Sequence, residues 1–166
     1  MKKTISVMLL CLMIVGIFAG CGKQGTGQQQ MAMMGNPWSQ WMSIEEAEAA
    51  ADFSFGLPAV IDARFYADEI RTMNNELIEV VYRDQTLEIC VRKQKGEGQD
   101  ISGDYNEYET CTEENIDGAT VIQYSNSDND AVKQLVSYNG FSWSFVAPNG
   151  YGEGSGLVFV YAILEE

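Results

Sequence analysis

The sequence contains no histidine, and this absence restricts the chemistry open to the protein. Histidine is the commonest general base and the commonest metal ligand in proteins. Without it, catalysis by Ser-His-Asp or Cys-His arrangements is excluded, as are zinc sites built with imidazole. The glycine-rich segments also lack the Gly-Lys-Ser/Thr run of a phosphate-binding loop. We therefore predict a protein that is not an enzyme and that holds no cofactor and no metal.

Basic residues are scarce as well. The chain has 10 lysine and arginine residues against 24 aspartate and glutamate residues, which gives a formal net charge of −14. A chain this acidic is repelled by nucleic acid and by anionic lipid headgroups. We expect no nucleic-acid partner, and we interpret the acidity as a source of solubility rather than as a sign of an acidic ligand.

The first 20 residues have the three parts of a secretory signal. Two lysines come first, and an uncharged apolar run of 15 residues then extends to Phe18. The run is short for a membrane span, which needs about 20 apolar residues. Phe18-Ala19-Gly20-Cys21 resembles a lipobox, where bacterial lipoproteins are acylated and cut before the cysteine, although leucine is more usual than Phe18. We predict a signal peptide over 1–20 and lipid attachment at Cys21. The alternative is a secreted protein cut after Gly20 without lipid.

Cleavage before Cys21 leaves 146 residues, which is enough for one domain with a single core. This part has 8 basic and 24 acidic residues, a formal net charge of −16. Residues 21–36 are rich in glycine and glutamine and lack periodicity, so we expect a flexible tether with a span of about 20 Å. Residues 37–166 are then a single domain on the extracytoplasmic face of the cell membrane. Two acyl chains, such as palmitate, would give stable membrane anchoring.

One helix is predicted at the start of this domain. Ser43 followed by Glu46 is a capping box, in which each side chain satisfies an exposed backbone donor of the first helical turn. The alanine- and glutamate-rich run that follows predicts a helix over 43–52, with Trp41 packed against its start. Its buried stripe is expected to consist of Ile44, Ala47, Ala50 and Ala51.

Beyond this helix the apolar period changes from 3.6 to 2, which indicates strands. Strands are predicted over 59–67, 69–73, 77–83, 86–93, 105–112, 119–125, 131–138 and 141–147. Short turns separate most of them, and Asn139-Gly140 is the strongest hairpin signal. We predict an α+β domain built on an antiparallel meander, with helices on one face and water on the other. The segment 157–164 fits a strand and a helix equally well.

Several runs together resemble an uncharacterised domain family found in secreted lipoproteins of Firmicutes. Related domains occur as extracytoplasmic parts of anti-sigma-factor-like membrane proteins. The resemblance implies a curved antiparallel sheet with an N-terminal and a C-terminal helix packed on one face, and it favours a helix over 152–165. It brings no established activity and no catalytic residues. The runs that carry it are Asn36-Pro37-Trp38, Ile44 to Ala50, Ile78 to Tyr82, Ile89 to Lys93, and Asp100-Ile101-Ser102-Gly103-Asp104-Tyr105-Asn106.

Cys90 and Cys111 are the two cysteines that remain after cleavage apart from Cys21. Outside the cytoplasm such a pair suggests a disulfide. Alternation places each cysteine on the polar face of its predicted strand. If the two strands were neighbours, the thiols would meet across that face. We therefore predict a Cys90–Cys111 disulfide, and two free thiols are the alternative.

The best candidate for a ligand surface is a polar, glycine-containing loop beside two tyrosines. It consists of Asp100, Ser102, Asp104, Tyr105 and Tyr108. The simpler alternative is a loop that caps the sheet through hydrogen bonds from Asp and Ser side chains to the backbone. The dense oxygen ligands of 125–130 lack the spacing of a calcium-binding loop, and a turn is the better interpretation.

Three functions remain open from the sequence. The first is a lipid-anchored, non-catalytic module that binds a small ligand or a protein partner at the cell envelope. The second is a sensory or regulatory module that acts with a membrane partner, by analogy with the anti-sigma-associated relatives. The third is a cell-wall glycan hydrolase that uses Glu107 and Glu109 as an acid pair, although these residues fit a solvated face better. The aromatic residues Trp38, Trp41, Phe141, Trp143 and Phe145 are expected mainly in the core rather than on a sugar-binding surface.

Overall fold

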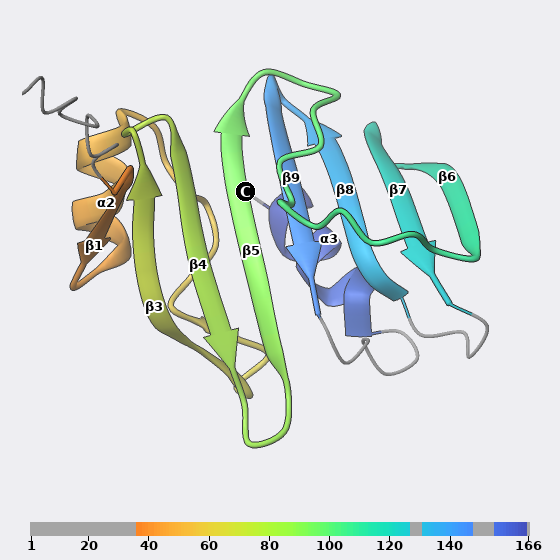
Figure 1. Ribbon diagram of the computed structural model, residues 1–166, viewed down its shortest axis with the longest axis horizontal. Coiled ribbons are helices and arrows are strands. Elements are labelled where there is room, and N and C mark those ends of the chain that lie inside the picture. The colour runs from red at the N-terminus through yellow and green to blue at the C-terminus, as the bar shows by residue number, and fades with distance from the viewer. Residues whose placement is uncertain (1–35, 127–130, 148–154, 166) are drawn as a thin grey trace, which may run out of the picture. The chain divides into compact units, whose positions relative to one another are not determined.

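The computed structural model describes residues 36–126, 131–147 and 155–165. These residues form one antiparallel sheet and two helices, an α+β architecture with an open, curled sheet (Figure 1). This agrees with the fold class predicted from the sequence. Neither helix is long and apolar enough to cross a membrane. In chain order the elements are β1 (Trp38–Trp41), α2 (Ile44–Ala51), β2 (Val60–Ile61), β3 (Phe65–Met73), β4 (Leu77–Arg83), β5 (Glu88–Lys95), β6 (Thr110–Ile116), β7 (Ala119–Ser125), β8 (Ala131–Tyr138), β9 (Phe141–Val146) and α3 (Ser155–Leu164).

The strand order is β1-β3-β4-β5-β9-β8-β7-β6, and the short β2 pairs with β3. The prediction of a simple meander is therefore wrong at one point, because β5 pairs with β9 and not with β6. The sheet consists of two meanders, β3-β4-β5 and β6-β7-β8-β9, that join along the β5–β9 ladder. The connection from β5 to β6 crosses in front of β9 and β8 (Figure 1). It comprises residues 96–109, which we call the strap loop.

The core lies on one side of the ladder. Alternate residues of β4, β5 and β9 point to this side, and among them Tyr82, Val91, Trp143 and Phe145 are almost fully buried. The same apolar cluster contains buried side chains of both helices. Trp143 and Phe145 are thus core residues, as predicted. The helix residues in the cluster are Ile44, Ala47 and Ala51 of α2 and Phe159, Val160 and Ile163 of α3.

Helix α2 begins and ends as its sequence predicts. Ser43 is the N-cap, and its hydroxyl accepts a hydrogen bond of 3.3 Å from the Glu46 backbone N–H. The Glu46 carboxylate accepts from Met42 N–H at 3.0 Å, one residue before the position that a standard capping box uses. Asp52 closes the helix in the left-handed conformation, with φ of 58°. The predicted neighbour Trp41 donates from its indole to Thr72 on β3.

Helix α3 resolves the ambiguity over the C-terminal apolar segment in favour of a helix. Its described part runs from Ser155 to Leu164, and residues 152–154 of the predicted helix lie outside the described residues. Phe159 is fully buried and packs against three rings, those of Phe65, Tyr82 and Phe145, with centroid distances of 5.3 to 5.9 Å. Aromatic packing of this kind adds to the free energy of burial, so Phe159 anchors α3 to the sheet.

Several predicted strands have different boundaries in the structure, among them the strand predicted over 86–93, which is β5 and runs from Glu88 to Lys95. The run predicted as a strand over 59–67 contains a turn, because Asp62 and Ala63 have positive φ values of 52° and 49°. β3 then continues to Met73 through a bulge between Ala67 and Glu69, where the sequence suggested a turn. The predicted strand 105–112 begins only at Thr110. The β8–β9 hairpin is correct, with positive φ values at Asn139 and Gly140.

The predicted disulfide is wrong in this structure. Cys90 lies on β5 and Cys111 on β6, and both thiols are free. Three strands, β9, β8 and β7, lie between them. Four strand spacings of about 4.8 Å are too wide for a disulfide. The error comes from the assumption that strands consecutive in sequence are neighbours in the sheet.

Replacement of Phe159 by alanine tests the attachment of α3. We expect Phe159→Ala to lower the free energy of unfolding by about 3–5 kcal/mol, because it leaves a cavity among three rings. Tyr161→Ala, on the same helix but 49% exposed, should lower it by less than about 1 kcal/mol. Urea denaturation followed by circular dichroism measures both. Equal losses for the two variants would contradict this packing.

The thiols should differ in reactivity. Burial, followed by the nearby Glu79 carboxylate, raises the pKa of Cys90 to about 12. Thiolates and not thiols react with alkylating agents, so Cys90 should react slowly in the folded protein while the exposed Cys111 reacts readily. Iodoacetamide labelling without reductant, followed by peptide mapping, should find Cys111 modified first and both residues modified in urea. A Cys90–Cys111 cross-linked peptide would restore the disulfide hypothesis.

Candidate functional site

The sheet face opposite the core has a charged centre. The side chain of Glu79 on β4 is fully buried between Arg71 of β3 and Arg92 of β5. Its Oε2 accepts from Arg92 Nε at 2.6 Å, and its Oε1 accepts from Arg71 Nε. The Trp38 ring of β1 lies against both guanidinium groups, 4.9 and 5.6 Å from their carbons. The strand register places these three residues opposite one another, so the ion cluster fastens three strands together.

The strap loop lies across this face and is held by backbone hydrogen bonds. Gly98 N–H donates to Ser137 Oγ and Gln99 N–H donates to Ser142 Oγ, each at 3.0 Å. Arg92 Nη1 donates to the Ile101 carbonyl, also at 3.0 Å. These contacts reach from β5 to β8. The strap loop is therefore a fixed layer on the sheet and not a free connection.

Four of the five predicted ligand residues serve to fold this loop. Asp100 Oδ1 accepts hydrogen bonds from both the backbone N–H and the hydroxyl of Ser102, and Ser102 Oγ accepts from Asp104 N–H. The hydroxyl of Tyr108 donates to the Asp104 carboxylate. Burial, together with this carboxylate, raises the pKa of Tyr108 to about 12, so the hydroxyl stays protonated as a donor. Tyr105 is 95% exposed and stands apart.

Lys133 of β8 connects the loop to the sheet, a role that no sequence pattern predicts beyond the position of a lysine inside an apolar strand. It is only 4% exposed. Its Nζ donates to Asp100 Oδ2 at 3.2 Å and to the Asp104 carbonyl at 3.3 Å, and lies 4.4 Å from the centre of the Tyr124 ring. Burial alone would raise the pKa of Asp100, but hydrogen bonds from Ser102 and Lys133 hold it below its ordinary value. The Asp100 carboxylate is therefore ionised at neutral pH.

Gly103 is required by the same arrangement. Its φ is +64°, in the left-handed region that favours glycine. A Cβ at this position would also collide with the guanidinium of Arg92. The glycine in the Asp-Ile-Ser-Gly-Asp run thus permits the close approach of the strap loop to β5.

A hollow of about 530 Å³ remains beside the strap loop. Its charged residues are mostly engaged, since Arg92 contacts Glu79 and Asp104 contacts Tyr108. Glu107 lines the hollow but Glu109 does not, so the structure does not bring the proposed acid pair together in it. The lining includes Cys90, Arg92, Asp104, Asn106, Glu107 and Tyr108.

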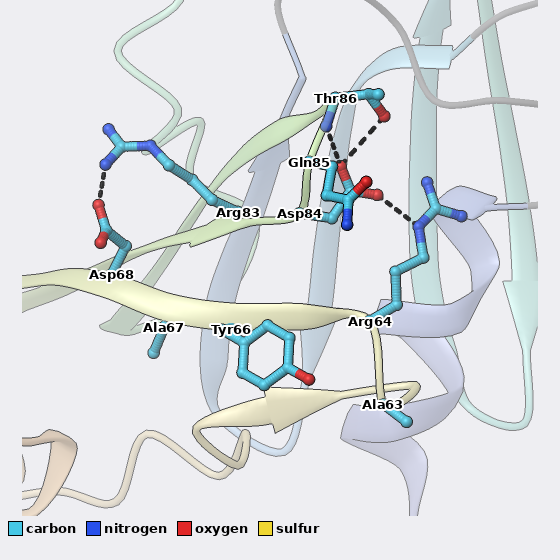
Figure 2. Close-up of a pocket in the computed structure, with 9 residues that line it drawn as sticks. All are labelled: Ala63, Arg64, Tyr66, Ala67, Asp68, Arg83, Asp84, Gln85 and Thr86. Carbon is cyan, nitrogen blue, oxygen red and sulfur yellow. Dashed lines mark hydrogen bonds and ion pairs between the residues drawn. The ribbon is translucent and has the colours of Figure 1, made fainter.

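A second hollow, of about 760 Å³, lies between the β2–β3 turn and the β4–β5 turn (Figure 2). Arg64 Nε contacts Asp84 Oδ2 at 2.5 Å, and Arg83 contacts Asp68. Tyr66 lies between these two ion pairs along β3, and 56% of it is exposed. No pattern in the sequence predicts this hollow, because its lining comes from two turns that are separated in the chain.

Asp84 organises the β4–β5 turn that forms one wall of this hollow. Its carboxylate accepts hydrogen bonds from the backbone N–H groups of Thr86 at 2.6 Å and Leu87 at 2.7 Å. The Thr86 backbone bond, followed by the Arg64 guanidinium, holds the pKa of Asp84 far below its ordinary value. The wall therefore keeps a fixed negative charge that is matched by Arg64.

The predictions that the protein holds no metal and has no catalytic residues come from the sequence. Among the residues that the structure describes, no group of three or more Cys, Asp and Glu side chains is placed to hold a metal ion. Part of the run considered as a calcium loop, residues 127–130, lies outside the described residues.

Lys133→Met tests whether this lysine holds the strap loop. We expect amides of 98–104 to exchange with deuterium at least 10-fold faster, because a charge-assisted hydrogen bond contributes about 1.5–3 kcal/mol. Lys95→Met is the matched control, since Lys95 donates to the Asp52 carbonyl instead, and it should leave this exchange unchanged. Unaltered protection in Lys133→Met would show that the loop is held without the lysine.

Comparisons with known proteins add no relatives to this picture. No protein-family model, no curated protein and no solved structure matches the chain. The resemblance to secreted lipoproteins of Firmicutes therefore stays a prediction from the sequence.

Proposed function

We propose that the protein is a lipid-anchored, non-catalytic binding module on the extracytoplasmic face of the cell membrane. The observation that carries this proposal is the uncharged apolar run that ends in Phe18-Ala19-Gly20-Cys21. Small residues before the cysteine suit cleavage by a signal peptidase, and the thiol is the group that accepts a diacylglyceryl chain. The two acyl chains of this diacylglyceryl group make such an anchor stable.

The charge of the domain is consistent with attachment through lipid alone. A formal net charge of −16 after cleavage repels anionic headgroups. The domain would then stand off the bilayer on the glycine- and glutamine-rich segment 21–36. Membrane contact through a basic surface is not needed in this proposal, because the acyl chains supply the affinity.

A binding role is favoured by the form of the two hollows. Their volumes of about 530 and 760 Å³ lie in the range of small-ligand sites, about 300–1,000 Å³. The ion pairs Arg64–Asp84 and Arg83–Asp68 fix polar groups at the edge of the larger one before any ligand arrives. In the same proposal, both helices pack on one face of the curved sheet, and the strap loop covers part of the opposite face.

Metabolic labelling with a clickable palmitate analogue tests the anchor. We expect label on the mature wild-type protein and recovery in the membrane fraction. Cys21→Ala should lose all label, because it removes the acceptor thiol. Cys11→Ala is the matched control: this cysteine lies within the signal, so label should persist. An unlabelled wild-type protein released into the medium would refute the lipid anchor.

A further inference from the structure

We propose that the larger hollow, centred on Tyr66, is a binding site for a neutral saccharide. This inference rests on the proposed binding function and names the ligand class of one site. The hollow at Tyr66 combines an exposed ring with polar groups that are already fixed in position.

The hollow exposes an aromatic surface at Tyr66. Tyr66 is 56% exposed, and its cross-strand partner Val60 is 42% exposed. Large apolar side chains usually gain free energy by burial. Among the described residues, the other exposed large apolar side chains are Met42, Tyr105 and Tyr161, and none of these lines the hollow. The C–H face of a sugar ring is apolar and flat, so it can cover a tyrosine ring while its hydroxyls stay in contact with polar groups.

The charges of the residues that line the hollow cancel. The ionisable lining consists of Arg64 and Arg83 against Asp68 and Asp84, so its formal charge is zero. Both arginines are engaged with carboxylates: Arg64 with Asp84, and Arg83 with Asp68, with Glu69 at 3.0 Å and with Glu88 at 2.8 Å. An anionic ligand would meet paired guanidinium groups on a chain whose formal charge is −14. A cationic ligand would find the carboxylates already paired. A neutral ligand does not need an unpaired charge in the hollow.

The polar groups of the hollow keep capacity for hydrogen bonds to a ligand. Figure 2 shows the two ion pairs on opposite sides of the Tyr66 ring, with the Gln85 amide near Asp84. Within the described residues, no hydrogen bond engages the Gln85 side chain, which is exposed. Each guanidinium has five N–H donors, and a carboxylate accepts several bonds, so paired groups keep capacity for a ligand. Sugar hydroxyls both donate and accept hydrogen bonds, so they suit a site that offers guanidinium donors beside carboxylate acceptors.

The hollow beside the strap loop is a poorer site for the same ligand. Its tyrosine, Tyr108, donates to Asp104 and packs on Tyr124, with ring centres 5.7 Å apart. The ring therefore has no free face comparable to that of Tyr66. The exposed Tyr105 is not among the residues that line this hollow. The two hollows thus make different predictions for tyrosine substitutions.

The test is calorimetric titration of the detergent-solubilised full chain with cellohexaose, maltohexaose and the hexamer of N-acetylglucosamine, and with hexagalacturonate as the anionic probe. We expect at least one neutral probe to bind and hexagalacturonate to bind at least 10-fold more weakly. Tyr66→Ala should weaken the neutral interaction at least 10-fold, and Gln85→Ala at least threefold. Tyr161→Ala, which removes a tyrosine of similar exposure from α3, should change it less than twofold.

Three results would overturn the inference: no binding of any neutral probe, binding that Tyr66→Ala leaves intact, or equal binding of hexagalacturonate. Loss of binding in Tyr105→Ala but not in Tyr66→Ala would move the site to the strap loop. Circular dichroism of each variant excludes unfolding as the cause, and Gln85→Ala keeps the test valid if Tyr66→Ala is unstable. The palmitate labelling of Cys21 is independent of these titrations, so failure of the saccharide site and failure of the anchor are distinguishable.

Discussion

The pairing of β5 with β9 is the interaction on which the rest of the structure depends. Six residue pairs, from Cys90↔Val146 to Lys95↔Phe141, join the two meanders into one sheet. They bring Val91 beside Phe145 and so make the core continuous. They also leave β6 at the far edge of the sheet. The chain must therefore cross the polar face between β5 and β6, and the strap loop follows from this requirement.

On the polar face, ionised groups are neutralised locally rather than by solvent. Glu79 pairs with two arginines, and Arg83 pairs with three carboxylates. Lys133 donates to the Asp100 carboxylate and to the Asp104 carbonyl. A buried charge is costly unless it is paired and hydrogen-bonded. Because each described cluster is satisfied within the fold, the groups keep defined orientations. A ligand at this face would meet polar groups that need little reorganisation, which favours affinity.

Local signals in the sequence predicted local structure well. The Ser43–Glu46 capping box located α2, and Asn139-Gly140 located the β8–β9 hairpin, because each depends on a few adjacent residues. Pairing between β5 and β9 depends on residues far apart in the chain and leaves no comparable signal, so the cysteine pairing was mispredicted. The strap-loop residues were predicted as a ligand surface, and the structure shows four of them in hydrogen bonds that fold the loop. Their contact with Lys133 on β8 could not be predicted, because it joins residues far apart in the chain. The hollow at Tyr66 was missed for the same reason.

The β5–β9 ladder also has a consequence for how the chain folds. Lys95 and Phe141, at its near end, are 46 positions apart in the sequence, while most other paired strands are joined by short turns. Closing so long a segment costs more chain entropy than closing a hairpin, and contacts of high sequence separation slow folding. We expect the two meanders to form first and their docking to be the slow step, during which the unpaired edges of β5 and β9 are open to wrong partners.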